Sequence, residues 1–479
     1  MKNVIVIGGG LAGLAASVAL AEAGWQVRLF EQRPYLGGRA TSYVLPAGEH
    51  VDNCQHVTLG CCTNLEDFYR RVGSSSKIRY FDRLVFVDPQ GRRGEMHAGM
   101  LPAPFHMTGS FVTFAPLTIA DKFSIARAML AIVSAKGHPR DLDERPAISM
   151  RTWLARRKQS KGAMERFWRV VLVSALDEEL DRTDARFGVD VFWKAFLSNR
   201  TGYRMGVPTV PLADLYDGCK TAMEKKGGEV SLRAPVRSVA IENGALAGVR
   251  FDEGRTETAD AYVFALPHRT LSALLPETLR ESEPAFRNLA KIRDAPITGV
   301  HFWFDREVME EPFITLLDTH TQWIFNKTML YGDTSAATHV SGPDAGTKAA
   351  TQYLQIVISA SYDLISKSRE EIIDLVLQEV RQALPKSRDA QLLKATVIKE
   401  TAATFSPEPG VDEWRPSQKT SIGKMFLAGD WTATGWPATM EGAVRSGYLA
   451  AEAVLRDAGM PQQFLQRDLP PDGLIKLFL

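Results

Sequence analysis

The stretch Val4-Ile5-Val6-Ile7-Gly8-Gly9-Gly10-Leu11-Ala12-Gly13 decides the fold. Its four β-branched residues predict a buried parallel strand, and its glycines predict a tight turn. Helical spacing then runs over Leu11–Ala23 and stops at Gly24, a suitable C-terminal cap. A second strand is expected over Gln26–Phe30. Strand, turn, helix and strand in this order predict a βαβ unit that opens a doubly wound sheet.

The glycines Gly8, Gly10 and Gly13 fit the dinucleotide fingerprint G-x-G-x-x-G. The first permits the turn, the second lets the backbone approach a pyrophosphate, and the third lets helix and strand pack closely. The N-terminus of the helix, at Leu11 and Ala12, would face the phosphates. Eighteen residues after Gly13, Glu31 can accept both hydroxyls of an adenosine ribose. The fingerprint leaves NAD and FAD both open.

Composition excludes several classes of function. The chain has 479 residues, enough for two or three domains, and its 57 Lys and Arg balance 56 Asp and Glu, which argues against a nucleic-acid binder. Its four cysteines form no C-x-x-C pair, which favours a reduced, cytoplasmic protein. No H-E-x-x-H or Cys/His cluster predicts a metal, and no G-x-S-x-G element predicts a hydrolase nucleophile. We expect no membrane-spanning helix, because no apolar run reaches about eighteen residues.

The segment Glu31-Gln32-Arg33-Pro34-Tyr35-Leu36-Gly37-Gly38-Arg39-Ala40 resembles the E-x-R-x-x-x-G-G-R signature of the flavin amine oxidase and carotenoid desaturase superfamily. This resemblance favours FAD over NAD. The glycine pair would permit a second backbone approach to the pyrophosphate, and Arg39 would add positive charge beside it.

Further matches to this superfamily extend over most of the chain. Ala259–Pro267 resembles its A-D-x-V-x-x-A-x-P strand, and Phe426–Trp431 ends another strand at an acidic residue. Thr439–Ala443 then begins a helix whose free N–H groups can stabilise negative charge on a reduced flavin. The residues that the resemblance assigns to FAD are Gly8, Gly10, Leu11, Ala12, Gly13, Glu31, Gln32, Arg33, Gly38, Arg39, Ala40, His56, Val57, Val236, Gly429, Asp430, Thr439, Met440 and Glu441.

Within the superfamily, three segments resemble the plant-type carotene desaturases and the hydroxysqualene dehydroxylases. They are Asp52–Gly60 followed by Asn64, Val300–Arg306, and Gln322–Lys327. The D-N-x-Q-H of the first and the Q-W-x-F-N of the third are closest to the dehydroxylases. In amine oxidases an aromatic side chain at the position of Thr439 forms part of a cage around the amine. We therefore expect an isoprenoid substrate here, not an amine.

The resemblance implies reductive dehydroxylation of hydroxysqualene to squalene, a step of squalene and hopanoid biosynthesis. Two alternatives stay open: a carotene-type desaturase that works in the opposite redox sense, and a flavin-binding protein without catalytic activity. His56 is a candidate proton donor, or a ligand of the cofactor or its loop. Asp52 is a candidate for stabilising an allylic cation, or a residue that fixes the loop. The resemblance implies a lipophilic isoprenoid partner and an external electron donor that no motif identifies.

The expected fold is α/β, with a discontinuous Rossmann-like FAD-binding domain and a mixed α/β substrate domain inserted into it. Residues 1–84, 211–296 and 412–460 are assigned to the FAD domain, and 85–210 and 297–411 to the substrate domain. Residues 100–135 and the tail Leu474–Leu479 are candidates for peripheral contact with the inner face of a membrane; core packing is the alternative. No pattern indicates an oligomeric state.

Overall fold

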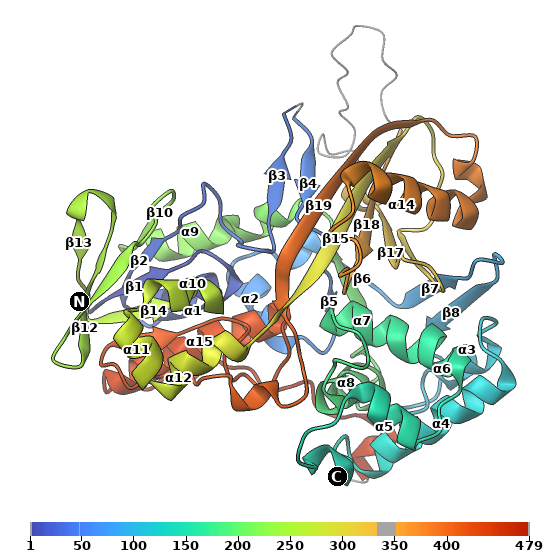
Figure 1. Ribbon diagram of the computed structural model, residues 1–479, viewed down its shortest axis with the longest axis horizontal. Helices are drawn as coiled ribbons and strands as arrows, with labels where there is room; N and C mark the ends of the chain where they lie inside the picture. The colour runs from blue at the N-terminus through green and yellow to red at the C-terminus, as the bar shows by residue number, and fades with distance from the viewer. Residues whose placement is uncertain (1, 47, 333–350, 478–479) are drawn as a thin grey trace, which may run out of the picture.

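Two β-sheets, one parallel and one mixed, organise this computed structural model, which describes residues 2–46, 48–332 and 351–477 (Figure 1). The expected substrate segment 297–411 therefore lies partly outside the described residues, as do the last two residues of the expected membrane tail.

The parallel sheet has five strands in the order β10-β2-β1-β14-β20. All neighbours pair in parallel, and the central strand β1 is apolar and almost wholly buried, as a strand covered on both faces must be. The bounds are β1 Asn3–Ile7, β2 Gln26–Phe30, β10 Glu229–Ser231, β14 Ala261–Phe264 and β20 Met425–Leu427. The predicted doubly wound sheet, assembled from the start, the middle and the end of the chain, is confirmed.

Helices α1 (Leu11–Glu22) and α15 (Met440–Asp457) pack against each other beside this sheet. The two helices approach closely because α15 has a glycine, Gly447, at the contact. A Cβ at this position would lie 2.3 Å from the carbonyl oxygen of Ala12, so a larger residue would push the helices apart. Gly13 serves the same purpose between α1 and β1, since its Cβ would lie 2.0 Å from the Gly8 carbonyl oxygen. The helix predicted over residues 11–23 is confirmed, and so is the one predicted to begin within Thr439–Ala443.

The mixed sheet has seven strands in the order β19-β15-β18-β17-β16-β7-β8. All pairs are antiparallel except β16 with β7. Helix α14 (Arg369–Ala383) buries one apolar stripe against strands of this sheet. The bounds are β7 Arg83–Val87, β8 Arg93–His97, β15 Asp294–Phe304, β16 Phe313–Leu316, β17 Trp323–Asn326, β18 Gln352–Ile358 and β19 Leu392–Phe405.

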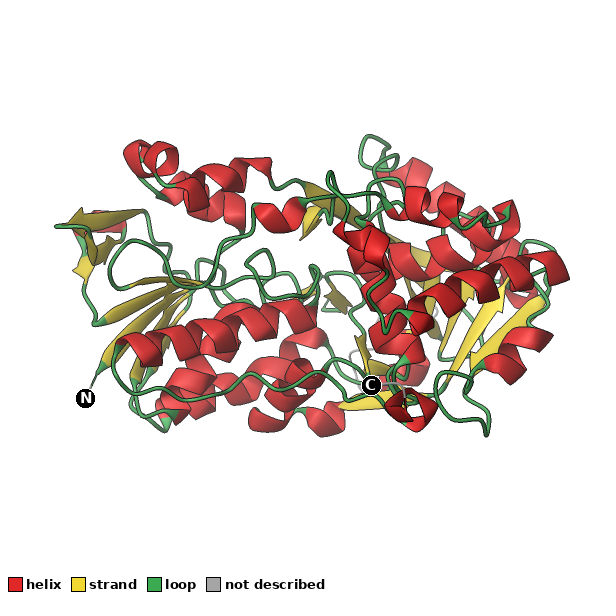
Figure 2. Cartoon of the chain, turned by 90° about the horizontal axis from the view of Figure 1, so that it is seen from below, coloured by secondary structure: helices red, strands yellow, loops and turns green. Residues whose placement is uncertain are grey.

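A group of helices covers the end of the molecule opposite the N-terminus (Figure 2). Two of them contain a π-helical turn, Met164–Arg169 between α6 and α7, and Phe192–Leu197 directly after α8. Of these helices the sequence pattern predicts only one, over residues 120–135, and α4 begins and ends one residue before those bounds. The bounds are α3 Thr108–Thr113, α4 Ile119–Ser134, α5 Met150–Arg156, α6 Lys161–Ala163, α7 Val170–Leu176 and α8 Ala185–Val191.

The C-terminal segment, residues 459–477, runs from α15 to the loop that precedes α3. The side chain of Asn199 donates to the Pro470 carbonyl oxygen (2.8 Å), and the backbone N–H of Leu474 donates to the Ala103 carbonyl oxygen (2.9 Å). A short 3₁₀ turn, Gly473–Leu477, ends the described chain. The end of the chain is thus tied to the helical region.

The two sheets follow the expected domain segments with two exceptions. Every strand of the parallel sheet comes from residues 1–84, 211–296 or 412–460. Strand β7 crosses the expected boundary after residue 84, and β15 crosses the one after residue 296. The domain division itself stays a prediction.

Candidate functional site: a cofactor edge and an apolar cavity

The two glycine-rich motifs lie side by side at the C-terminal edge of the parallel sheet. The backbone N–H of Gly37 donates to the Gly9 carbonyl oxygen (2.8 Å), and Gly10 pairs with Gly37 in an isolated β-bridge. A Cβ on Gly38 would lie 2.9 Å from the Cα of Gly10, so no larger residue fits there without a shift. Helix α1 begins at this point without a side-chain cap. This arrangement of bare backbone suits a pyrophosphate.

Glu31 lies beside this edge with its carboxylate buried. Its Oε2 accepts the backbone N–H of Gly9 (2.6 Å), and its Oε1 accepts that of Arg33 (2.8 Å). The neighbouring Gln32 is exposed. The sequence pattern predicts a strand over Val236–Glu242, but the strand found there, β11 (Ser238–Glu242), begins two residues later, so Val236 lies just before it. Its loop reaches Glu31 through the N–H of Ala234, which donates to the Glu31 carbonyl oxygen (2.9 Å).

Arg39 joins the second glycine motif to the C-terminal motif. Its Nη2 donates to Asp430 Oδ1 at 2.7 Å, and its Nη1 donates to the Ala403 carbonyl oxygen at 2.7 Å. Burial would lower the pKa of Arg39, but the carboxylate of Asp430 outweighs burial and the pKa is raised. A fixed positive charge therefore lies where the sequence predicted one. Nearby, the buried Oδ1 of Asn53 has no hydrogen-bond partner among the described residues.

The start of α15 forms the third part of the edge. Thr439 is its N-cap, and its hydroxyl accepts the N–H of Gly442 (3.0 Å). The buried carboxylate of Glu441 accepts the N–H of Leu65 (2.7 Å) and the side-chain amide of Asn64 (2.9 Å), both in α2 (Thr63–Arg71). Burial raises the pKa of Glu441. Glu441 thus links α15 to the first turn of α2.

Asp52, a predicted catalytic candidate, is at the centre of a buried cluster. Its Oδ2 accepts Lys327 Nζ (2.8 Å) and the Tyr331 hydroxyl (2.7 Å). Its Oδ1 accepts the Ser42 hydroxyl (2.7 Å) and the N–H of Leu212 (3.1 Å). Burial would raise the pKa of Asp52, but the charge of Lys327 and these hydrogen bonds lower it. The geometry favours the loop-fixing alternative, because both oxygens already have donors.

His56, the other catalytic candidate, is half-buried, and its Nδ1 lies 3.2 Å from the Cys54 carbonyl oxygen. Burial lowers the pKa of His56, which disfavours the charged form of the imidazole. Its neighbours Gln55 and Val57 line the cavity described next, and His56 itself does not. Gln55 Oε1 accepts Lys327 Nζ at 2.7 Å. We did not single out Gln55 from the sequence, although the alternation of side chains along an extended loop could have indicated it.

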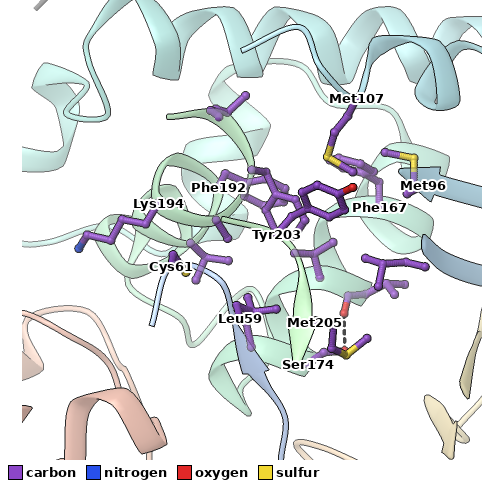
Figure 3. Close-up of a pocket in the computed structure, with 18 of the residues that line it drawn as sticks. Leu59, Cys61, Met96, Met107, Phe167, Ser174, Phe192, Lys194, Tyr203 and Met205 are labelled. Carbon is purple, nitrogen blue, oxygen red and sulfur yellow. Dashed lines mark hydrogen bonds between the residues drawn. The ribbon is translucent and has the colours of Figure 1, made fainter. Parts of the chain in front are cut away.

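An apolar cavity of about 640 Å³ begins at the cofactor edge and extends into the helical region (Figure 3). Thr439, Met440 and Glu441 line one part of it, and Phe105 and Leu130 another. Both π-helical turns contribute to its wall, and the ring of Phe167 in one stacks on that of Phe192 in the other, with 5.6 Å between centroids. Other lining residues are Leu59, Met96, Met107, Phe111, Met129, Phe196, Met205 and Phe325.

Two of the three segments that resemble the isoprenoid enzymes, Asp52–Gly60 and Gln322–Lys327, line the cavity, and no residue of Val300–Arg306 does. The indole N–H of Trp323, on the cavity wall, donates to the Ser174 hydroxyl (2.7 Å), and Gln322 bonds the backbone of Ser359. In the third segment, the Tyr353 hydroxyl is 2.7 Å from Nδ1 of the buried His301. Lys327 then connects this sheet to Asp52.

Two kinds of site are absent from the described ranges. No group of three or more His, Cys, Asp or Glu side chains there is placed to hold a metal ion. Among the helices that the structure describes, none has both the length and the apolar character needed to cross a bilayer.

Comparison with known proteins agrees with this geometry. The sequence model of the flavin containing amine oxidoreductases matches residues 11–455. The zeta-carotene desaturase of Synechocystis sp. is 28% identical, with 95% of this chain and 97% of that protein covered. The 15-cis-phytoene desaturase of Solanum lycopersicum is 27% identical, covering 95% and 78%.

Solved structures show the same fold. An oxidoreductase from Methanosarcina mazei superposes with a TM-score of 0.70 at 19% identity, covering 95% of this chain and 100% of that one. Cyclohexylamine oxidase from Brevibacterium oxydans gives 0.65 at 17%, covering 96% and 99%. FAD is the cofactor that these comparisons support, and the assignment of the glycine edge, Arg39 and the start of α15 to it stays a prediction. The chain belongs to the flavin containing amine oxidoreductase family, as an FAD-dependent oxidoreductase of the carotenoid desaturase type.

Proposed function

We propose that this protein oxidises or reduces a long acyclic isoprenoid hydrocarbon at an allylic carbon, in the cavity next to the start of α15. The cavity is the main support for this proposal, because its wall is mostly Phe, Met, Leu and Val and it reaches Thr439–Glu441 at the cofactor edge. Such a wall binds an apolar chain by burial and keeps water from the reacting carbon. FAD supplies a hydride acceptor when oxidised and a hydride donor when reduced.

Desaturation is the direction that the relatives favour, since they include zeta-carotene and phytoene desaturases matched over most of their length. In this reaction the substrate loses a hydride from one carbon and a proton from its neighbour, and a carbon–carbon double bond forms. The hydride goes to the oxidised cofactor and the proton is released to solvent. Because of these relatives, we place desaturation first.

Reductive dehydroxylation of hydroxysqualene is the second candidate. The D-N-C-Q-H segment at 52–56 and the Q-W-I-F-N segment at 322–326 favour it, because they are closest to the dehydroxylases and both reach the cavity wall. The allylic C–O bond would break, the hydroxyl would leave with a proton as water, and the carbon would receive the hydride. Gln55, which directly precedes His56, places a polar amide on that wall, and its Oε1 accepts a hydrogen bond from Lys327 Nζ.

One anaerobic experiment separates the candidates. Holoprotein with oxidised FAD is mixed with phytoene or zeta-carotene, and holoprotein reduced with dithionite is mixed with hydroxysqualene. Flavin bleaching with a new double bond in the product supports desaturation. Flavin reoxidation with squalene supports dehydroxylation. Unchanged flavin absorbance in both mixtures contradicts both and favours a flavin-binding protein without this chemistry.

A further inference from the structure

One amide side chain on the cavity wall is held at both ends by the protein. Gln55 lines the cavity and is only 9% exposed. Its Oε1 accepts a hydrogen bond from Lys327 Nζ at 2.7 Å, and its Nε2 donates to the His56 carbonyl oxygen at 3.0 Å. A polar group in a mainly apolar wall therefore has a defined position.

The two partners agree on which end of the amide is the oxygen. An ammonium group can only donate hydrogen bonds, so the atom that faces Lys327 must be Oε1. A backbone carbonyl can only accept, so the atom that faces the His56 carbonyl must be Nε2. Turning the amide over would place two donors together at Lys327 and two acceptors together at His56. The orientation of the Gln55 amide follows from this chemistry.

Lys327 is itself fixed by its surroundings. Its side chain is 0% exposed, and its Nζ also donates to Asp52 Oδ2 at 2.8 Å. The same ammonium lies 4.1 Å from the centroid of the Tyr331 ring, whose hydroxyl bonds Asp52 as well. Asp52 therefore keeps Lys327 charged and in place, and Lys327 in turn holds the oxygen end of the Gln55 amide.

The loop that carries Gln55 is tied to the cofactor edge and to the mixed sheet. The side-chain amide of Asn53 donates to the Arg39 carbonyl oxygen at 2.9 Å. The side-chain amide of Gln355, on β18, donates to the Asp52 carbonyl oxygen at 3.3 Å. The backbone on the N-terminal side of Gln55 is thus anchored from two directions, which places the amide between the cofactor edge and the cavity.

The amide nitrogen of Gln55 has a second hydrogen, for which the described part of the chain provides no acceptor. The hydroxyls of Ser174, Tyr203 and Thr439 on the same wall differ in this respect (Figure 3). Each of them has one hydrogen and donates it to a backbone carbonyl oxygen of the protein, at 2.7, 2.9 and 3.3 Å respectively. Gln55 therefore retains an N–H that a bound molecule can use.

A free N–H in an apolar cavity favours a ligand that brings an acceptor. A pure hydrocarbon would cover this N–H and leave it without a hydrogen bond, which costs binding free energy. The cation on the oxygen side of the amide polarises it and strengthens the donor. Both candidate reactions supply an oxygen: hydroxysqualene has its hydroxyl, and a prenylated quinone that accepts electrons in a desaturation has its carbonyls.

We propose that Gln55 donates its free N–H to an oxygen atom on the isoprenoid chain that occupies the cavity, and that Lys327 is the positioning residue that orients the amide for this contact. The cavity then prefers an apolar chain with an acceptor oxygen to the hydrocarbon of the same length. The isoprenoid class of the ligand rests on the proposed function, whereas the preference for oxygen is a property of binding that does not require turnover.

Two matched pairs of ligands test this preference. Hydroxysqualene is compared with squalene, and a prenylated quinone with the hydrocarbon of the same chain length. Each is titrated anaerobically into holoprotein with oxidised FAD, and the change in flavin absorbance gives the affinity. The test variants are Gln55→Leu and the double variant Asp52→Asn with Lys327→Met, which leaves no buried charge unpaired. The matched control is Gln90→Leu, at an exposed position outside the cavity lining.

We expect the wild type and the control to bind the oxygen-bearing member of at least one pair about tenfold to 100-fold more tightly than its hydrocarbon. Gln55→Leu should lose this preference and keep the affinity for the hydrocarbon. In the double variant the amide is free to turn over, and the preference should fall about threefold to tenfold. A purely structural role would weaken both members of a pair equally and leave their ratio unchanged.

The pair that shows the preference identifies the source of the oxygen, an alcohol substrate or a quinone. The proposal is overturned if the wild type shows no preference in either pair, or if Gln55→Leu keeps it. It is also overturned if Gln55→Leu lowers FAD affinity and leaves the ratio unchanged, because the N–H would then serve the cofactor. A double variant with the full preference would remove Lys327 from this role. A preference without any flavin redox change would contradict the proposed function and leave this inference standing.

Discussion

Lys327 Nζ lies 2.8 Å from Asp52 Oδ2, in an ion pair whose side chains are 0% and 1% exposed. The two residues are 275 positions apart in the chain. Lys327 begins α13 (Lys327–Tyr331), and Asp52 ends β4 (His50–Asp52), next to the loop that brings Gln55 to the cavity. The pair therefore holds one wall of the cavity in place.

Replacing Lys327 should destabilise the protein strongly. In Lys327→Met the Asp52 carboxylate stays buried without its cation, and we expect the free energy of unfolding to fall by about 3–5 kcal/mol. Urea unfolding of the holoprotein measures this change. In the double variant Lys327→Met with Asp52→Asn no charge is left unpaired, so part of the loss should be recovered. A single variant as stable as the wild type would contradict the assigned role.

His301 should make the protein sensitive to acid. Burial lowers the pKa of His301 from its ordinary 6.5 to about 3. Below pH 6.5 the unfolded chain therefore binds a proton that the folded chain does not, and stability falls as pH falls from 6.5 toward 3, by up to about 1.4 kcal/mol per pH unit. Unfolding measured at several pH values should show a shallower slope in His301→Phe.

The Arg39–Asp430 pair predicts a loss of cofactor binding. Arg39→Ala removes the fixed positive charge beside the glycine edge, and we expect FAD affinity to fall about tenfold to 100-fold. Titration of apoprotein with FAD, followed by flavin fluorescence, measures this. Arg293→Ala, which removes an arginine whose side chain is 70% exposed, is the control and should bind FAD normally. Equal affinity in both variants would contradict a role for Arg39.

Blocking the cavity should lower turnover without lowering the FAD content of the protein. Ala175→Trp places a large ring on the cavity wall, and we expect kcat/KM to fall about tenfold or more with FAD content unchanged. Ala155→Trp, at an exposed position of α5, is the matched control. Normal turnover in Ala175→Trp would show that the substrate binds elsewhere.

The geometry separates Gln55 from His56. Gln55 lines the cavity and His56 does not, so we expect Gln55→Leu to lower kcat about tenfold and His56→Ala to lower it less. Single-turnover flavin kinetics with intact FAD content would measure both. A larger loss in His56→Ala would support His56 as the proton donor that the sequence indicated.

Parts of this site follow from local sequence, and others do not. Strand β1 and helix α1 were predictable because apolar runs and glycines specify them within about twenty residues. Strand β19 was missed because most of its fourteen residues are only half-buried and give no clear alternation. The motif residue Lys327 was visible in the sequence, but its pairing with Asp52 depends on how two distant segments meet. The π-helical turns left no signal either, because their backbone pattern depends on the surrounding packing.

Those two turns, Met164–Arg169 and Phe192–Leu197, are places where the chain can lose one residue and the cavity wall can change shape as a result. A π-helical turn holds one more residue than an α-helical turn. Deleting a single residue would restore the α-helical register, and the helix that follows would keep its orientation, because the wider turn had absorbed the extra residue. In the first turn this would reposition Arg166 and Phe167 on the cavity wall and leave Val171 and Ala175, which follow the turn, in place. A one-residue deletion would therefore reshape the cavity locally, without any substitution elsewhere in the lining.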